Sequence, residues 1–264
     1  MPTNKSKTAK IISVTNQKGG VGKTTTTINL AAALSQFQKK VLIIDLDPQG
    51  NASTGLGVEV EDRELSTYEF LVEGVPLEKV TMETEISGLN IVPATIDLSS
   101  ADIDLISNEK RSHLLHAALR KKQQDKQKYD YILIDCPPSL NILTVNAMVA
   151  SHSVLIPLQS EFFALEGLSQ LLLTVKEVRQ TANENLRVEG IVLTMFDGRN
   201  NLSKQVEADA RSNLRELVFK TIIPRNVRVS EAPSYSMPVL TYDPSSKGSK
   251  AYMSLAKELL ANNS

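Results

Sequence analysis

Short, uninterrupted apolar runs recur along the chain, and longer stretches with apolar residues at helical spacing separate them. A short run bounded by turn residues is typical of a strand buried on both faces, whereas the longer stretches are typical of amphipathic helices. The strands predicted in this way lie at 10–15, 41–46, 89–93, 130–135, 153–157 and 188–194. Because strands and helices alternate, we expect an α/β fold with a single doubly wound, mostly parallel sheet and helices on both of its faces.

No linker, repeat or low-complexity tract divides the chain, so we expect one domain over residues 1–264, with a flexible N-terminal tail at 1–9. The segment from Gly50 to Gly88 is acidic and rich in turn residues, which predicts a small helical excursion from the sheet. A last helix is predicted at 251–261.

The first predicted strand leads directly into a glycine-rich run, Lys18-Gly19-Gly20-Val21-Gly22-Lys23-Thr24-Thr25, and a helical pattern follows it. This order is typical of a phosphate-binding loop, in which backbone N–H groups and the positive end of a helix surround phosphate oxygens. We expect Lys23 to reach the β and γ phosphates of a nucleotide and the Thr24 hydroxyl to bind Mg²⁺. The ordinary loop has a glycine where Gln17 stands, and here an additional lysine, Lys18, opens the loop instead.

Three aspartates follow predicted strands at the edge where the phosphate loop lies. Asp45 and Asp47 end the strand at 41–46, and Asp135 ends the strand at 130–135. Carboxylates at the carboxyl ends of parallel strands line a ligand crevice, and Asp135 is placed to hold Mg²⁺ through water as a Walker B acid does. A lone aspartate more often caps a turn or a helix, but three of them beside a phosphate loop favour a metal site.

Composition agrees with a globular enzyme, since 41% of the 264 residues are hydrophobic, 22% are charged and the formal net charge is −1. The single cysteine, Cys136, excludes an internal disulfide and indicates a reducing compartment. Residues 1–10 are polar and basic, and no run approaches the ~20 apolar residues of a membrane span. We therefore expect a cytoplasmic protein.

Four segments together resemble the ParA/Soj-type chromosome-partitioning ATPases of the MinD/ParA superfamily, which carry this deviant form of the phosphate loop. They are the loop itself, Asp45-Leu46-Asp47-Pro48-Gln49-Gly50-Asn51, Ile134-Asp135-Cys136-Pro137-Pro138 and Ile223-Pro224-Arg225-Asn226-Val227-Arg228. The segments occur in the family's order and at its spacing, from about Lys10 to the C-terminus. The resemblance implies a P-loop NTPase fold, ATP and Mg²⁺ as cofactors, and ATP hydrolysis.

The resemblance also implies a role for each site residue. Asp47 orients the attacking water, Asp45 lies close to the Mg²⁺ shell, and Lys18 reaches across an ATP-dependent homodimer to the partner's phosphates. The catalytic residues are then Lys18, Lys23 and Asp47, and the metal-binding ones are Thr24, Asp45 and Asp135. The implied nucleotide-binding residues are Lys18, Gly19, Gly20, Val21, Gly22, Lys23, Thr24 and Thr25, with Met195, Pro224 and Asn226 around the adenine. Without the resemblance, Lys18 is interpreted as a solvated lysine and Pro224 as a turn former.

Positive charge is concentrated between residues 199 and 228, where the sequence contains seven basic and three acidic residues. A solvated helix face is the simplest interpretation of composition alone. The resemblance implies instead that Arg199 and Arg228 bind double-stranded DNA non-specifically in the ATP-bound dimer, and it makes Arg225, Lys247 and Lys250 further candidates. It further implies nucleoid association and a ParB-type centromere-binding protein that stimulates hydrolysis. Because only residues 1–17 precede the loop, we do not expect a helix-turn-helix segment that reads operator sequence.

Two other functions of the same fold stay open. A MinD-like membrane switch ends in a basic amphipathic helix that lies on lipid, but Tyr252, Leu255, Ala256 and Leu259 predict a core-facing stripe in the last helix, and hence no membrane binding. A small-molecule enzyme of the dethiobiotin synthetase kind uses the loop for phosphoryl transfer and does not need Lys18 in trans. An iron protein of the nitrogenase type takes two cysteines from each subunit, which a chain with one cysteine cannot supply.

Overall fold

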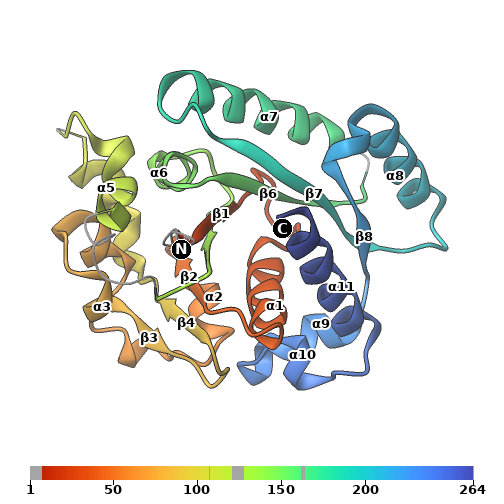
Figure 1. The fold of residues 1–264 in the computed structure, drawn as a ribbon, viewed down its shortest axis with the longest axis horizontal. Coiled ribbons are helices and arrows are strands. Elements are labelled where there is room, and N and C mark those ends of the chain that lie inside the picture. The colour runs from red at the N-terminus through yellow and green to blue at the C-terminus, as the bar shows by residue number, and fades with distance from the viewer. Residues whose placement is uncertain (1–7, 107, 121–127, 162–163, 264) are drawn as a thin grey trace, which may run out of the picture.

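The computed structural model describes residues 8–106, 108–120, 128–161 and 164–263. Within these residues one sheet forms, with the strand order β3-β4-β2-β5-β1-β6-β7-β8 (Figure 1). The strands are β1 Lys10–Val14, β2 Val41–Asp45, β3 Met82–Glu83, β4 Leu89–Val92, β5 Tyr131–Asp135, β6 Ser153–Gln159, β7 Arg187–Phe196 and β8 Val218–Pro224. β3 pairs antiparallel with β4, and the other pairings are parallel. The predicted α/β class with a doubly wound sheet is confirmed.

Helices cover both faces of the sheet (Figure 1). The α-helices are α1 Lys23–Gln36, α2 Asn51–Thr54, α3 Leu77–Val80, α4 Ala101–Asp104, α5 Leu114–Arg120, α6 Ile142–Ala150, α7 Ala164–Thr181, α8 Asn201–Leu214, α9 Val227–Glu231, α10 Val239–Tyr242 and α11 Lys247–Asn262. Short 3₁₀ segments are η1 Val60–Asp62, η3 Ile96–Ser100, η4 Arg111–His113, η5 Arg215–Leu217 and η6 Ala232–Tyr235, and η2 Glu69–Glu73 is a π-helical turn.

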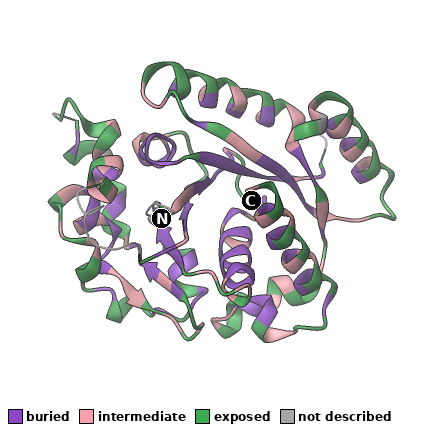
Figure 2. Cartoon of the chain, in the orientation of Figure 1, coloured by how far each residue is buried: buried purple, intermediate pink, exposed green. Residues whose placement is uncertain are grey.

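Alternate residues of each central strand enter different cores, which explains why the strands are apolar throughout. In β2, Val41 and Ile43 pack in the core formed with α1 and α11, whereas Leu42 and Ile44 pack in the core on the α5 and α6 side. All four side chains have no exposed surface, and Figure 2 shows the central strands buried. A strand with helices on both faces has no solvent face on which polar residues are favoured.

Two strands were not predicted from the sequence, and they lie at the two edges of the sheet. β3 has only two residues, which is too short to produce an apolar run. β8 lies within the basic tract, and its apolar residues neither alternate nor form an unbroken run, because Lys220 and Thr221 interrupt them. An edge strand has a neighbour on one side only, so its sequence pattern is weaker.

The predicted excursion between Gly50 and Gly88 is confirmed, since α2, η1, η2 and α3 form there. The last helix, α11, begins at Lys247, four residues before the predicted start, with the Ser246 hydroxyl capping it by accepting from the Ser249 N–H. Its predicted core-facing stripe, Tyr252, Leu255, Ala256 and Leu259, is 0–1% exposed. In the part of the chain that the structure describes, no helix is long and apolar enough to span a membrane. The predicted tail at 1–9 lies largely outside the described residues.

Candidate nucleotide-binding site

The glycine-rich loop joins β1 to α1, as predicted, at the carboxyl edge of the central strands. Gly20 has φ 73° and Gly22 has φ 85°, a left-handed backbone that other residues adopt at a cost. Gly22 is also the N-cap of α1, so the first free N–H groups of the helix open toward the loop. The loop therefore has the conformation and the helix end that an anion requires.

Side chains that the sequence interpretation did not single out hold the loop in place. The Asn16 side chain accepts a hydrogen bond from the Lys18 N–H at 3.0 Å and donates one to the Pro157 carbonyl at 2.8 Å. The Thr194 hydroxyl donates to the Val21 carbonyl at 2.8 Å. In the sequence, Asn16 is a polar residue directly after an apolar strand, which was the available signal. Its partner Pro157 lies on β6, and Thr194 lies on β7, so sequence alone did not indicate these contacts. The loop is thus preorganised before any ligand binds.

The two lysines of the loop have different surroundings. Lys23 is 7% exposed, and its amine donates to the Lys18 carbonyl at 3.0 Å. Burial lowers the pKa of Lys23, while the carboxylates of Asp135 and Asp47 act to raise it. The Lys18 amine instead bonds the Glu161 carboxylate at 2.8 Å, with both side chains about half exposed. Lys23 therefore faces into the loop, whereas Lys18 lies at its mouth and turns away from it.

Asp45 and Asp135 lie side by side, because β2 and β5 pair in register at these residues. Both are fully buried. Asp135 accepts a hydrogen bond from the Thr27 hydroxyl at 2.9 Å through Oδ1, while its Oδ2 is buried without a partner among the described residues. A buried carboxylate oxygen without a partner is costly, and a bound cation removes that cost. The residues present therefore fit Mg²⁺ at Asp135.

Both oxygens of Asp45 are already used by the protein. Oδ2 accepts from the Ser53 N–H at 2.9 Å and from its hydroxyl at 2.7 Å, and Oδ1 accepts from the Asp47 N–H at 3.3 Å. Because both oxygens already accept hydrogen bonds, Asp45 fits a position near the ligands of the metal ion better than it fits the role of a direct metal ligand. Ser53, which sequence reasoning missed, is the residue that fixes its orientation.

Burial raises the pKa of Asp135 to about 8, and the neighbouring Asp45 carboxylate raises it further, while the nearby Thr24 hydroxyl and the hydrogen bond from Thr27 oppose the shift. Burial likewise raises the pKa of Asp45 to about 6, against the hydrogen bonds from Ser53. Two adjacent buried carboxylates repel each other, and a divalent cation between them and the loop would relieve that repulsion. The Thr24 side chain lies beside Asp135, as the predicted metal site requires.

In the described residues, no group of three or more His, Cys, Asp or Glu side chains gathers that would hold a metal ion by itself. Mg²⁺ prefers six oxygen ligands and is commonly bound by one or two protein groups together with phosphate oxygens and water. The set of Thr24 and Asp135 beside a phosphate loop agrees with that mode of binding. A Mg²⁺ site at these two residues would therefore be complete only with a nucleotide.

Asp47 lies in a tight turn between β2 and α2. It is 6% exposed, and its Oδ1 accepts from the Gln49 N–H at 3.0 Å. Gly50 follows with φ 63°, and Arg63 packs so close to it that a side chain there would collide with the guanidinium. The Arg63 guanidinium is buried and donates to the Ala94 carbonyl at 3.0 Å, so it anchors this turn to the end of β4.

The residues expected around adenine come from two neighbouring segments, the end of β7 and the end of β8 with the turn that follows it. Met195 has φ 51°, which is strained for a residue with a side chain, and its Cε would be 3.8 Å from a Cβ placed on Gly22. Pro224 ends β8 opposite Phe196 of β7, and Asn226 caps α9 by accepting from the Val229 N–H at 3.3 Å. Met195 is thus next to the loop, and Pro224 and Asn226 follow on the neighbouring strand.

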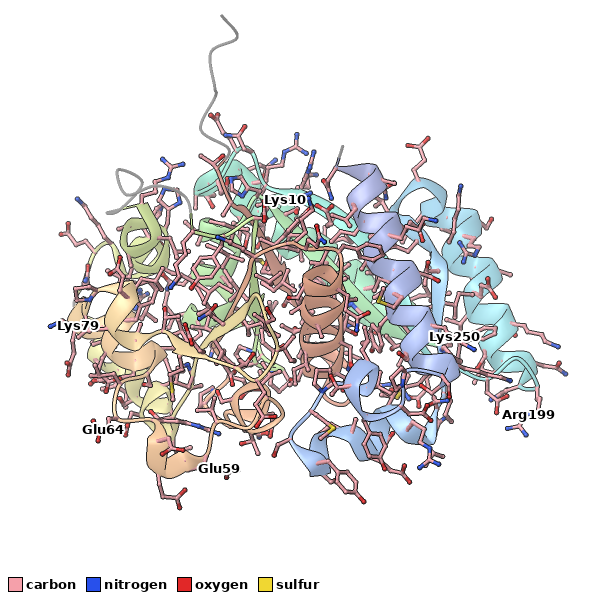
Figure 3. The ribbon with its side chains drawn as sticks, turned by 60° about the horizontal axis from the view of Figure 1, so that its bottom comes forward. Lys10, Glu59, Glu64, Lys79, Arg199 and Lys250 are labelled. Carbon is pink, nitrogen blue, oxygen red and sulfur yellow. The ribbon has the colours of Figure 1, made fainter. Side chains whose placement is uncertain are left out.

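The basic residues expected at DNA lie on the surface toward the α8 and α11 end of the molecule, where Figure 3 labels Arg199 and Lys250. Arg199 is 92% exposed and bonds Asp197 at 2.9 Å. Arg228 bonds Glu231 at 2.9 Å and Asp243 at 3.5 Å. Lys247 and Lys250 are exposed in the first turn of α11, and Arg225 follows β8. Exposed ion pairs contribute little stability, so these arginines can exchange a carboxylate for a phosphate at small cost.

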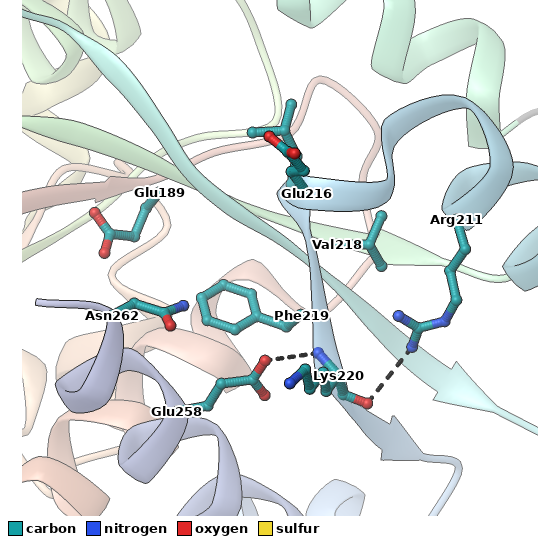
Figure 4. A pocket seen from close by; sticks show the side chains of 9 residues that line it. Glu189, Arg211, Glu216, Val218, Phe219, Lys220, Glu258 and Asn262 are labelled. Atoms are coloured by element: carbon teal, nitrogen blue, oxygen red, sulfur yellow. Dashed lines mark hydrogen bonds between the residues drawn. The ribbon is translucent and has the colours of Figure 1, made fainter.

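A separate pocket of about 340 Å³ lies at the start of β7 and β8, opposite the carboxyl edge that carries the loop (Figure 4). It is lined by Glu189, Arg211, Glu216, Leu217, Val218, Phe219, Lys220, Glu258 and Asn262. Its Glu258 carboxylate accepts from the Lys220 N–H at 2.7 Å, so the carboxylate already serves the backbone of β8. None of the predicted site residues lines this pocket.

Replacing Asp135 with asparagine is expected to raise the thermal stability of the ligand-free protein. The pKa of Asp135 is raised from 3.8 to about 8 in the folded state, so folding favours the protonated carboxyl. Below pH ~4 the carboxyl is protonated in both the folded and the unfolded state and carries no penalty. As the pH rises toward ~8, wild type loses stability because the unfolded state releases the proton more readily. Asparagine does not titrate, so the Tm difference between variant and wild type should grow across this window, to on the order of 5 °C. Thermal melts with a chelator at several pH values measure it, with Asp62→Asn on the surface as control. A Tm difference that does not depend on pH would contradict the assignment.

Three comparisons place these features among known proteins. The family model described as AAA domain matches residues 9–188. The chain is 51% identical over 253 residues to the sporulation initiation inhibitor protein Soj of Bacillus subtilis, covering 96% of this chain and 99% of that protein. It is 50% identical over 252 residues to the chromosome partitioning protein ParA of Caulobacter vibrioides, covering 96% and 94%. Cobyrinic acid a,c-diamide synthase from Mycobacterium smegmatis, solved with bound ATP analog and magnesium, has a TM-score of 0.82 and 36% identity, covering 96% and 95%.

Proposed function

This chain belongs to the AAA-domain family and, within it, to the Soj/ParA chromosome-partitioning ATPases, and we propose that it is an ATP-dependent dimeric switch on DNA. Its activity is ATP hydrolysis, with ATP and Mg²⁺ as cofactors. In the proposed cycle, ATP joins two subunits, the dimer binds double-stranded DNA without sequence preference, and hydrolysis releases it. The chemistry serves to time the release.

The observation that carries the proposal is the orientation of Lys18. A single lysine, Lys23, already faces into the loop, and the Lys18 amine is held at the mouth by Glu161. Two lysines in one phosphate loop are redundant for a monomer. A second subunit that brought its own loop to this mouth would receive the Lys18 charge at its phosphates, where it would act as an arginine finger supplied in trans does.

Within one subunit the proposed roles follow from position. The backbone N–H groups from Gly19 to Thr25 hold the phosphates, the Lys23 amine neutralises the β and γ oxygens, and Asp47 orients the attacking water. Bound Mg²⁺ would supply positive charge to the transferred phosphoryl group. Thr24 and Asp135 would hold that ion, Asp45 would support it through Ser53 and Asp47, and Met195, Pro224 and Asn226 would enclose the adenine. Lys23, Asp45, Asp47 and Asp135 are at most 7% exposed, so their charges lie away from bulk solvent.

The proposed DNA surface comprises Arg199, Arg225, Arg228, Lys247 and Lys250, of which Figure 3 labels Arg199 and Lys250 toward the α8 and α11 end. One such surface is a weak binder, because each exposed cation at a phosphate contributes mainly through counterion release. Joining two subunits doubles the number of phosphate contacts, so DNA affinity becomes coupled to ATP. We further propose a ParB-type protein as the partner that stimulates hydrolysis, and association with the nucleoid.

Replacing Lys18 with alanine is expected to leave ATP binding within about threefold of wild type and to abolish both ATP-dependent dimers and DNA binding. The reason is that Lys18 contributes its charge to the partner's site, while Lys23 supplies the charge within the subunit. Mass measurement and a DNA titration with and without ATP and Mg²⁺, at two salt concentrations, test this. Glu161→Gln is the matched control, because it breaks the Lys18 ion pair but keeps the lysine. A Lys18→Ala protein that dimerises with ATP would remove the trans role.

The DNA titration also tests the proposed function as a whole. Wild-type protein should bind unrelated DNA sequences equally, only with ATP and Mg²⁺, and more weakly as salt rises. Absence of DNA binding with every nucleotide would overturn the switch. Similarity to cobyrinic acid a,c-diamide synthase favours a small-molecule enzyme as the second candidate. That candidate requires ATP turnover to depend on a small acceptor and to ignore DNA and protein partners.

A further inference from the structure

A strongly acidic segment lies in the half of the molecule away from Arg199 and Lys250. Between residues 57 and 109 the chain carries thirteen acidic and two basic residues, and one of the two, Arg63, is buried. Figure 3 shows Glu59 and Glu64 at the end of the molecule away from Arg199 and Lys250. A surface this acidic repels DNA and anionic lipid headgroups alike. Its partner must therefore be positively charged or neutral.

Three isoleucines are exposed on this acidic half, within η3, α4 and the turn after it. Ile96 is 71% exposed, Ile103 is 74% exposed and Ile106 is 70% exposed. The intervening apolar residues Leu98, Ala101 and Leu105 are at most 3% exposed and pack in the core. The segment thus has two apolar sides, of which only one is covered. Scattered exposed apolar residues are normal, but three exposed isoleucines between residues 96 and 106 concentrate apolar surface in one short segment.

We define the isoleucine patch as Ile96, Ile103 and Ile106 together with the acidic residues Asp97, Asp104 and Glu109 of the same segment. From 96 to 109 the sequence contains no basic residue. Two of the acids are fixed, since the Asp104 carboxylate accepts from the Tyr68 hydroxyl at 3.0 Å and from the Ser100 hydroxyl at 2.6 Å, and Asp97 accepts from Thr95 at 3.0 Å. The acidic groups around the apolar centre therefore have defined positions.

The beginning of the patch is also tied to the candidate nucleotide site. Ala94, two residues before Ile96, donates its N–H to the Ser53 hydroxyl at 3.0 Å, and that hydroxyl donates to Asp45 at 2.7 Å. The end of β4 and the carboxylate at the end of β2 are therefore connected through one side chain. The isoleucine patch has a fixed position relative to the site, outside the basic DNA surface.

We infer that the isoleucine patch is a docking surface for a basic amphipathic helix of a protein partner. Apolar residues at i, i+3 and i+4 of such a helix would cover the isoleucines, and lysines or arginines beside them would pair with the acidic groups. Charge complementarity selects this occupant, because the patch combines an apolar centre with acids of one sign. Binding itself is independent of the proposed function. Any effect of the docked helix on hydrolysis rests on that function, through the Ser53 connection.

The test uses a lysine–leucine peptide of about 14 residues, with leucines at helical spacing, and an isomer of the same composition with the order scrambled. Fluorescence anisotropy measures binding to the full chain without nucleotide or DNA. The amphipathic peptide should bind. The double variant Ile103→Ser, Ile106→Ser should bind it at least about tenfold more weakly, because it lacks two exposed isoleucines that the peptide would cover. Glu109→Lys should weaken binding less, and mainly at low salt. Leu173→Ser, which removes an exposed apolar residue of α7, is the control and should bind as wild type.

Equal binding of the scrambled isomer, or unchanged affinity of the double isoleucine variant, would overturn the inference. Loss of ATP-dependent dimers or of self-association in the double variant would assign the patch to a second copy of this chain and would overturn it as well. The basal ATPase rate of the double variant should equal that of wild type. Failure of the DNA switch would instead appear as absent DNA binding by wild type, with peptide binding intact, so the two failures are distinguishable.

Discussion

Replacing Lys23 with alanine is expected to weaken ATP binding by on the order of 100-fold or more and thereby to remove hydrolysis. The amine is buried at the end of the phosphate loop, where few water molecules can replace its charge. Each charge-assisted hydrogen bond to a phosphate oxygen contributes about 1.5–3 kcal/mol, and Lys23 is placed to make two. The buried carboxylates of Asp135 and Asp47 would also lose the positive charge of the Lys23 amine beside them.

Titration with a fluorescent ATP analogue in the presence of Mg²⁺ measures the loss directly. A second readout is the thermal shift, because a ligand that binds only the folded state raises Tm in proportion to the logarithm of its concentration over Kd. Wild type should show the shift and Lys23→Ala should not. Lys79→Ala, which removes a lysine from the acidic half, is the control for loss of positive charge. Retention of wild-type affinity in Lys23→Ala would place the phosphates elsewhere.

Replacing Asp47 with alanine is expected to lower the hydrolysis rate by about 10²–10⁴-fold while ATP binding and dimer formation persist. Asp47 stands at the edge of the site in a turn held by Gln49, Gly50 and Arg63, so its carboxylate has a fixed direction. Removing it takes away the group that orients water, but no group that holds the phosphates or the metal. The protein should then remain bound to DNA after ATP is added, because release requires hydrolysis.

Phosphate release and retention on immobilised DNA after an ATP chase measure the two effects separately. Asp47→Asn keeps the shape and the acceptor for the Gln49 N–H, so it distinguishes loss of the charge from collapse of the turn. Both variants should be slow in hydrolysis and long-lived on DNA. Rapid release of Asp47→Ala from DNA would separate hydrolysis from release and would contradict the timing role proposed for the chemistry.

Most of the central sheet was predictable because each strand is buried on both faces and is therefore apolar throughout, as Val41 to Ile44 illustrate. The loop was predictable for a related reason, since Gly20 and Gly22 adopt a left-handed backbone that favours glycine. The edge strand β8 was not predicted, because contacts on one side impose a weaker pattern. Polar residues that act through distant partners were missed as well, such as Asn16, Thr27 and Ser53.

The sequence by itself determined which residues form the loop and which charged residues lie near it. The glycines, the two lysines and the three aspartates directly follow apolar strands. Tertiary structure alone decided how those charges interact. Register between β2 and β5 makes Asp45 and Asp135 neighbours, and their burial raises both pKa values. It also decided that Lys18 turns toward Glu161 and that Ile96, Ile103 and Ile106 face solvent. Local sequence specifies backbone preference and hydrophobicity, whereas burial and partners depend on residues that only folding brings together.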